Sequence, residues 1–222
     1  MNIRSAIKQE ALAMDINRLT IKGTSMLKII VIIVLIIASW SFAMQKNRGD
    51  YVNQPYQRAS EVSSKTLVVV YSLTGNTEAL AKEIAKKHNA ELLFITAEAY
   101  EGGRGGTSAA YDAWFEKEKP IEPATVNLGQ YDTVYLGSPI WWYRPAPPLW
   151  TFIKSNDFSS TDVILFNTFN SKFKQKNIDK FAAIVEANGG TFKDHIYIRR
   201  GRATPFQKNT QDVVNESKEL LK

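Results

Sequence analysis

The sequence predicts an α/β domain with a doubly wound, five-stranded parallel sheet of order 2-1-3-4-5, preceded by one N-terminal transmembrane helix. Between residues 65 and 222, apolar β-branched runs alternate with segments of helical periodicity, which is typical of crossover units and a parallel sheet. A hydroxyl- and glycine-rich loop joins the first run to the first helical segment. An uncharged apolar stretch precedes the whole pattern.

The predicted strands share short runs of β-branched and aliphatic residues, and they cover 65–71, 91–96, 131–137, 161–167 and 191–198. Helical segments are expected between them at 77–88, near 147–155 and at 177–188. A last helix is expected to run to Leu221, because Thr204-Pro205 is typical of an N-cap followed by a first-turn proline.

Composition excludes several kinds of site. The chain has 222 residues, which suits one ordinary domain plus an extension. It has no cysteine, so disulfides, thiol catalysis and cysteine metal sites are excluded. Its two histidines, His88 and His195, are too far apart in sequence to suggest a metal cluster. We therefore expect no metal site and no catalytic side chains.

The net charge of +6 is unevenly distributed along the chain. Residues 1–64 hold 8 Lys and Arg against 4 Asp and Glu, whereas residues 65–222 hold 20 against 18. A basic leader beside an apolar stretch indicates a membrane, and we expect no nucleic-acid partner.

The apolar stretch at 29–44 has 16 residues and no charge, and as a helix it covers about 24 Å of a hydrocarbon core about 30 Å thick. Met26 and Leu27 extend it if Lys28 snorkels, so the predicted segment is 26–44. It is either an uncleaved anchor or a signal peptide with a cleavage site at 41–43. The anchor is favoured, because aromatic residues carry the apolar run almost to its end.

The apolar segment also defines the other parts of the chain. Residues 1–25 are expected to be a short cytoplasmic tail, or untranslated, since Met14 and Met26 are alternative starts. Residues 45–64 are polar and predict a linker, and residues 65–222 form the domain. A modest excess of basic residues before the segment predicts a single-pass protein in the cell membrane with an extracytoplasmic domain. Cleavage would instead release a secreted domain.

The loop after the first strand suits a phosphate group. Ser72, Thr74 and Thr77 supply hydroxyl donors, Gly75 allows close approach, and the following helix directs backbone N–H groups and the positive end of its dipole at an anion. The loop lacks the Gly-Lys-Ser/Thr ending of nucleoside triphosphate sites and the spaced glycines of dinucleotide sites, so both ligands are disfavoured.

Two further loops should meet this one, because ligands of such sheets bind beyond the carboxyl ends of the strands, at the switch point. The loop at 138–148 is aromatic and rich in proline, which suits a flat heteroaromatic ring. Adjacent side chains of an extended segment face opposite sides, so one of Trp141 and Trp142 is expected to face the core. The third loop covers 168–173.

On these motifs, residues 66–198 resemble the flavodoxin family. The Ser-x-Thr-Gly-Asn-Thr loop is similar to that family's phosphate motif, and Gly-Ser-Pro-Ile-Trp-Trp followed by prolines resembles its second flavin loop. The resemblance implies a flavodoxin-like fold that binds FMN. It implies phosphate contacts from Ser72, Thr74, Gly75, Asn76 and Thr77, and ring contacts from Pro139, Ile140, Trp141, Trp142 and Tyr143, with Thr168 at the start of the third loop.

The chain departs from the family in three ways. Phe169, Asn170, Lys172 and Phe173 occupy the third loop, which is glycine-rich in many relatives; the domain is slightly basic; and an apolar leader is present. The leading hypothesis is a membrane-tethered, FMN-binding electron-transfer protein with an unknown redox protein partner. The alternatives are an exported flavodoxin-fold module that binds a protein or phosphorylated ligand without flavin, and an NAD(P)H-dependent flavin or quinone reductase.

Overall fold

The computed structural model describes residues 26–32, 35, 55–58, 64–101, 107–202 and 207–222. They belong to two compact units, 1–46 and 47–222. In the first unit residues 26–32 and 35 are helical. None of the helices in the described parts of the chain has both the length and the apolar character needed to cross a membrane. The predicted tail and most of the predicted segment 26–44 and linker 45–64 lie outside the described residues.

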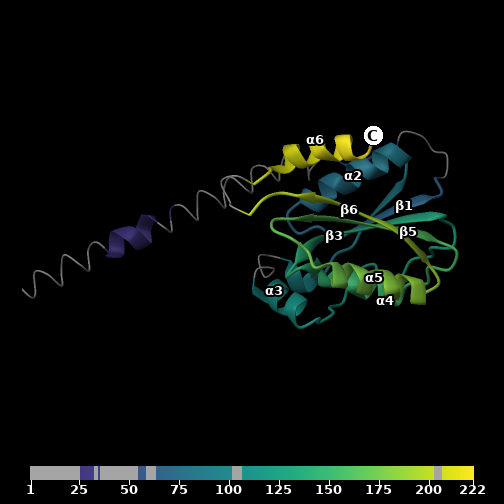
Figure 1. Ribbon diagram of the computed structural model, residues 1–222, viewed down its shortest axis with the longest axis horizontal. Coiled ribbons are helices and arrows are strands. Elements are labelled where there is room, and N and C mark those ends of the chain that lie inside the picture. The colour runs from purple at the N-terminus through teal and green to yellow at the C-terminus, as the bar shows by residue number, and fades with distance from the viewer. Residues whose placement is uncertain (1–25, 33–34, 36–54, 59–63, 102–106, 203–206) are drawn as a thin grey trace, which may run out of the picture. The chain divides into compact units, whose positions relative to one another are not determined.

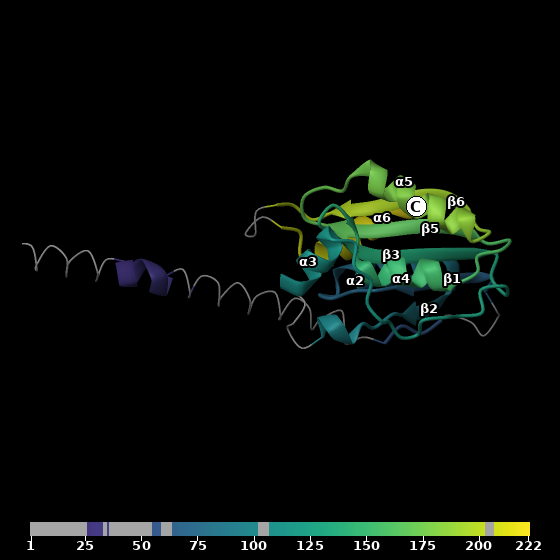
Figure 2. The same ribbon diagram turned by 90° about the horizontal axis from the view of Figure 1, so that it is seen from below.

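The second unit is built on one sheet of order β2-β1-β3-β5-β6, whose strands are all parallel (Figures 1 and 2). This confirms the predicted order 2-1-3-4-5 for the five main strands. A sixth strand, which was not predicted, pairs antiparallel with the end of β3. The strands are β1 Thr66–Val70, β2 Glu91–Phe94, β3 Thr133–Trp141, β4 Arg144–Pro145, β5 Asp162–Phe169 and β6 Thr191–Arg199.

Helices cover both faces of this sheet. In Figure 1, α2 and α6 lie on one face and α4 and α5 on the other, with α3 on the α4–α5 side. The helices are α2 Asn76–His88, α3 Thr107–Trp114, α4 Pro147–Ser155, α5 Gln175–Ala187 and α6 Thr210–Leu220, with a 3-10 turn at Glu98–Tyr100. The short helix α3 and the 3-10 turn were not predicted.

The predicted start of the last helix was wrong. The helix α6 begins at Thr210 because Asn209 caps it: the Asp212 N–H donates to Asn209 Oδ1 at 2.9 Å, and the Asn209 N–H donates to Asp212 Oδ2 at 2.8 Å. This reciprocal pair is a capping box, which satisfies two backbone donors at once. The Thr204-Pro205 pair itself lies outside the described residues.

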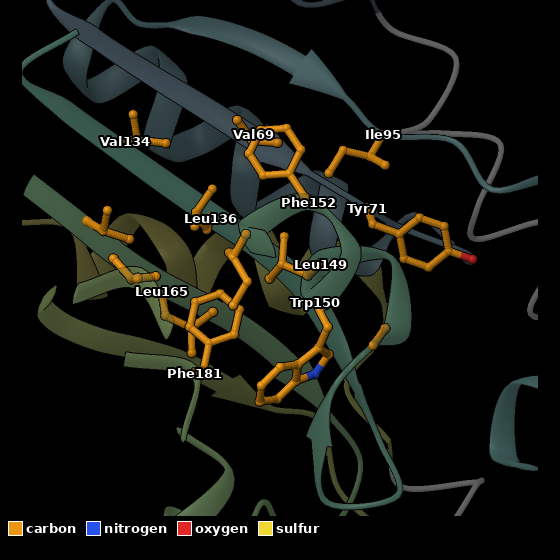
Figure 3. Close-up of a cluster of buried hydrophobic side chains, with 14 of the residues drawn as sticks. Val69, Tyr71, Ile95, Val134, Leu136, Leu149, Trp150, Phe152, Leu165 and Phe181 are labelled. Atoms are coloured by element: carbon orange, nitrogen blue, oxygen red, sulfur yellow. The ribbon is translucent and has the colours of Figure 1, made fainter. Parts of the chain in front are cut away.

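Each central strand is buried on both sides, which is why its sequence is mostly apolar. Val69, Leu136 and Leu165 point toward α4 and α5, where Figure 3 shows them in one cluster with Leu149, Phe152 and Phe181. Alternate residues of the same strands point toward α2 and α6. Helices thus pack against the sheet on both faces. The carboxyl ends of its strands are therefore held in place, and so are the loops that begin there.

The strand β3 is longer than predicted. It was expected to end at Gly137 but continues to Trp141, because β4 pairs with its last residues, Ile140 with Pro145 and Trp141 with Arg144. Gly137 itself lies against the ring of Phe166: a Cβ at this glycine would lie 1.9 Å from Phe166 Cζ. Only glycine therefore fits here while Phe166 keeps its place on β5.

Candidate flavin site

The three predicted loops lie together at the carboxyl ends of β1, β3 and β5, which are neighbours in the sheet. A buried hydrogen bond of 2.7 Å joins Thr77 Oγ1 of the first loop to Thr168 Oγ1 near the end of β5. The second loop is tied to the segment after β5, because the Tyr143 carbonyl accepts from the Lys174 N–H at 3.0 Å and from the Asn177 side chain at 2.9 Å. The sheet thus brings all the predicted site residues to one edge.

The first loop leaves the N-terminus of α2 open. Gly75 is the N-cap residue, with φ 84° and ψ −12°, and no side chain caps the helix. The left-handed conformation favours glycine. The Gly75 N–H donates to Ser72 Oγ at 3.2 Å, which closes the turn. Because the first N–H groups of a helix have no partner within it, an anion at this end would gain hydrogen bonds and a favourable dipole.

The polar side chains of this loop fall into two groups. Asn76 is buried and already paired: its Nδ2 donates to Thr74 Oγ1 at 3.1 Å, and its Oδ1 accepts from Thr210 Oγ1 at 3.3 Å. Ser72 and Thr74 use their oxygens as acceptors within the loop, so each hydroxyl keeps its hydrogen to donate. The Asn76 side chain therefore shapes the loop, while Ser72 and Thr74 can bind an anion.

The second loop is a two-residue hairpin turn between β3 and β4. Its central residues, Trp142 and Tyr143, have φ values of 49° and 70°. Such turns need positive φ at both positions and favour Asn-Gly, because bulky side chains are strained there. An observed backbone strain of this kind is common at ligand sites, where the surrounding structure holds it in place.

The two adjacent tryptophans face different environments, as predicted. The Trp141 ring meets those of Tyr71 and Tyr100 edge-on at 5.6 and 5.2 Å, against the core. Trp142 is 49% exposed. Burial raises the pKa of both tyrosines, so their hydroxyls stay neutral. Pro139 and Ile140 are half-buried on β3, so an apolar ring has a partly open wall to pack on.

A buried polar network that the sequence did not reveal supports this second loop. Ser138 Oγ accepts from the Ala146 N–H at 3.1 Å, and Asn167 Nδ2 donates to the Ser138 carbonyl at 2.7 Å. Asn167 Oδ1 then faces His195 Nε2 at 2.8 Å. The sequence offered one signal for this network: Ser138 and Asn167 are polar residues near the ends of otherwise apolar strands.

His195 is the outer end of this network. Burial lowers its pKa to about 4, although Asp194 opposes the shift, so the ring is neutral at pH 7. Because the Asn167 amide donates elsewhere, His195 must carry its hydrogen on Nε2 and donate it to Asn167. The His195 side chain thus has a structural role, since it completes the hydrogen bonding of the buried Asn167.

The third loop packs on its own domain. Thr168 is not in the loop but is the penultimate residue of β5, which corrects its predicted place. The rings of Phe169 and Phe173 lie 5.5 Å apart, and Phe173 meets Tyr197 of β6 at 5.1 Å. The residues that replace the family's glycines therefore extend the core toward the edge strand.

Comparison with known proteins decides the family. The Flavodoxin family matches residues 65–193. This chain is a flavodoxin family member. The matched range contains all three loops, so the expected resemblance is confirmed for the fold and for the family. No curated protein sequence matches the chain.

Solved structures agree with the fold of this flavodoxin family member. A protein assigned as a flavoprotein from Bacteroides uniformis is 23% identical, with a TM-score of 0.52 over 70% of this chain and 99% of that chain. A flavoprotein from Lactobacillus acidophilus in complex with FMN is 20% identical, with a TM-score of 0.51 over 61% and 93%. A third, from Bacteroides eggerthii, is 18% identical with a TM-score of 0.52 over 71% and 98%.

Proposed function

We propose that this flavodoxin family member is a membrane-tethered electron-transfer protein that binds FMN. The observation that carries the proposal is the uncapped N-terminus of α2 behind Gly75, beside the partly open aromatic wall of β3. One end of the site suits a phosphate and the other suits a flat apolar ring. FMN carries both groups, a phosphate at one end and an isoalloxazine ring at the other. The FMN bound to the Lactobacillus acidophilus relative, which has the same fold, supports this choice.

Different residues would bind the phosphate and the ring of FMN. Backbone N–H groups of the first turn of α2, with the hydroxyls of Ser72 and Thr74, would hold the phosphate. Thr77 and Thr168 share one hydrogen bond, so only one hydroxyl hydrogen of the pair is left for the ligand. Pro139, Ile140 and the Trp141–Tyr143 segment would pack on the ring and exclude water from it.

Bound FMN would supply the redox chemistry, and the protein would supply binding, orientation and electrostatics. The Ser138–Asn167–His195 network holds the wall of the site through neutral hydrogen bonds. No proton transfer by a side chain is needed for this role. The function therefore rests on the shape of the site rather than on catalytic groups.

A flavin titration tests the proposal. A protein comprising residues 55–222 is mixed with micromolar FMN. Binding is expected to quench the FMN fluorescence, and the protein should remain yellow after gel filtration. Riboflavin, which lacks the phosphate, is the matched control and is expected to bind more weakly. Full fluorescence of FMN at these concentrations, with no retained colour, would reject the proposal.

The membrane tether rests on the uncharged stretch at 29–44 and its basic flank. Alkaline carbonate extraction of cell membranes tests it, since a tethered chain stays in the pellet. Protease added to intact cells should digest the domain if it is extracytoplasmic. Recovery of the intact chain in the soluble fraction would exclude the anchor without affecting the flavin titration.

A flavin-free module is the second candidate, and one observation favours it. Thr77, Thr168 and Asn76 already satisfy much of their hydrogen-bonding capacity within the protein. The third loop likewise fills its own space with aromatic rings. In the same titration, inorganic phosphate that binds where FMN does not would support this second function.

A further inference from the structure

An exposed group of aromatic side chains lies beside the second loop. Tyr111 and Trp114 of α3 are 51% and 56% exposed, Phe115 is 56% exposed, and Trp142 of the turn is 49% exposed. The rings of Trp114 and Trp142 lie 5.0 Å apart, and those of Tyr111 and Phe115 lie 4.6 Å apart. We name these four residues the aromatic patch.

The clustering of these side chains is unusual for this molecule. In the described part of the domain, only Phe94, Tyr197 and Leu220 are other large hydrophobic residues with comparable exposure, and all three belong to different elements. Scattered exposed apolar residues need no explanation, whereas a contiguous group marks a contact surface. The aromatic patch is therefore suited to contact a partner outside the domain.

The charge around the aromatic patch points to the chemistry of that partner. The Lys117 ammonium lies 4.6 Å from the Tyr111 ring, and those of Lys172 and Lys174 lie 5.7 and 5.1 Å from the ring of Tyr143, next to Trp142. None of these three lysines forms an ion pair with a described residue. They would attract an anionic surface.

Nearby carboxylates do not cancel this charge. The segment 107–119 contains three acidic residues, and each is bound to a cation: Asp112 to Lys119 at 3.4 Å, Glu116 to Arg144 at 2.9 Å, and Glu118 to Lys154. The unpaired charge of this segment is therefore the positive charge of Lys117. Exposed Trp and Tyr with unpaired lysines are the residues that favour the boundary between lipid headgroups and acyl chains.

We propose that the aromatic patch and Lys117, Lys172 and Lys174 dock the domain on the surface of an anionic phospholipid bilayer. The inference rests on the proposed tether but not on flavin binding. Twenty residues, 45–64, separate the apolar segment from the domain, and a chain of that length reaches at most about 70 Å. This reach keeps the local lipid concentration high, so a weak contact suffices. Docking turns the second loop toward the bilayer.

Site-specific labelling of the full chain tests the docking. The chain has no cysteine, so Ala110→Cys on α3 carries one environment-sensitive dye, and Asn215→Cys on α6, on the opposite face of the sheet (Figure 1), carries the same dye as control. The chain is reconstituted without flavin in phosphatidylcholine vesicles, with or without phosphatidylglycerol. A dye at 110 is expected to shift to the blue and to be quenched by spin-labelled lipid only when phosphatidylglycerol is present. The dye at 215 is expected to stay unchanged.

Two sets of substitutions make the result specific. Trp114→Ser with Phe115→Ser should abolish the shift, and Lys117→Gln, Lys172→Gln and Lys174→Gln together should reduce the docked-to-undocked ratio by about fivefold per lysine. The matched control removes the same charge from Lys86 of α2, Lys218 of α6 and the C-terminal Lys222, and should have little effect. Equal signals at both dye positions, or a shift that needs no anionic lipid, would overturn the proposal. A shift that grows with protein concentration in neutral vesicles would instead identify a second copy of the chain as the partner.

Discussion

Thr77 and Thr168 are 91 residues apart in sequence, yet their hydroxyl oxygens lie 2.7 Å apart inside the protein. Thr77 is 1% exposed in the first turn of α2, and Thr168 is 3% exposed near the end of β5. The bond therefore ties the loop that follows β1 to a strand two positions away in the sheet. The phosphate end of the candidate site is held from both sides.

The first prediction concerns this pair. Thr168→Val should destabilise the domain by about 1–3 kcal/mol, because it leaves the buried Thr77 hydroxyl without a partner. Thr77→Val should have a similar effect. The double variant should lose less than the sum, since both polar groups are then gone. Urea unfolding of the four proteins gives the free energies, and strictly additive losses would show that the hydroxyls do not interact.

A second prediction separates phosphate binding from ring binding. Thr74→Val removes a hydroxyl that can still donate to the ligand and should weaken FMN binding by about 1–3 kcal/mol. Riboflavin has no phosphate, so its affinity should not change. Thr125→Val, an exposed substitution of the same kind, is the control. If Thr74→Val weakens both flavins equally, the hydroxyl contacts the ring or ribityl chain and the phosphate lies elsewhere.

A third prediction follows from the strained turn. Replacing Trp142 and Tyr143 by Asn and Gly, the residues that suit positive φ at both positions, should stabilise the domain by about 1–3 kcal/mol. The same change should weaken FMN binding, because it removes two proposed ring contacts. Thermal unfolding and fluorescence titration measure the two effects. Loss of stability would mean that the packing of these rings outweighs the backbone strain.

Much of the fold could be predicted because it depends on long, local patterns. The continuous apolar runs of β1 and β5 and the helical periodicity of α2 and α5 indicated strands that alternate with helices, and the doubly wound class then implied the order of the sheet. Gly75 likewise indicated the open helix end. A glycine between a strand and a helix allows the left-handed backbone of a tight turn and adds no side chain that could cap the helix.

What could not be predicted depends on tertiary contacts. The turn at Trp142 and Tyr143 has the residues least typical of its type, so only the pairing of β4 with β3 reveals it. The α3 helix has eight residues, too few for a clear periodic signal. Asn167 is polar in an apolar strand, and its purpose emerges only when Ser138 and His195 are seen on either side.

The last prediction uses His195 as an internal probe of this network. Its pKa is about 4 in the folded state, because burial disfavours the charged ring, against about 6.5 when unfolded. Between these values the unfolded chain binds a proton that the folded one does not, so stability should fall as the pH drops from 6.5 to 4. His195→Gln, which can still donate to Asn167, should lose this component of the pH dependence in urea unfolding. His88→Gln reports the other histidine separately, since burial also lowers the His88 pKa. An identical pH dependence in wild type and His195→Gln would place a freely titrating, solvated ring at position 195.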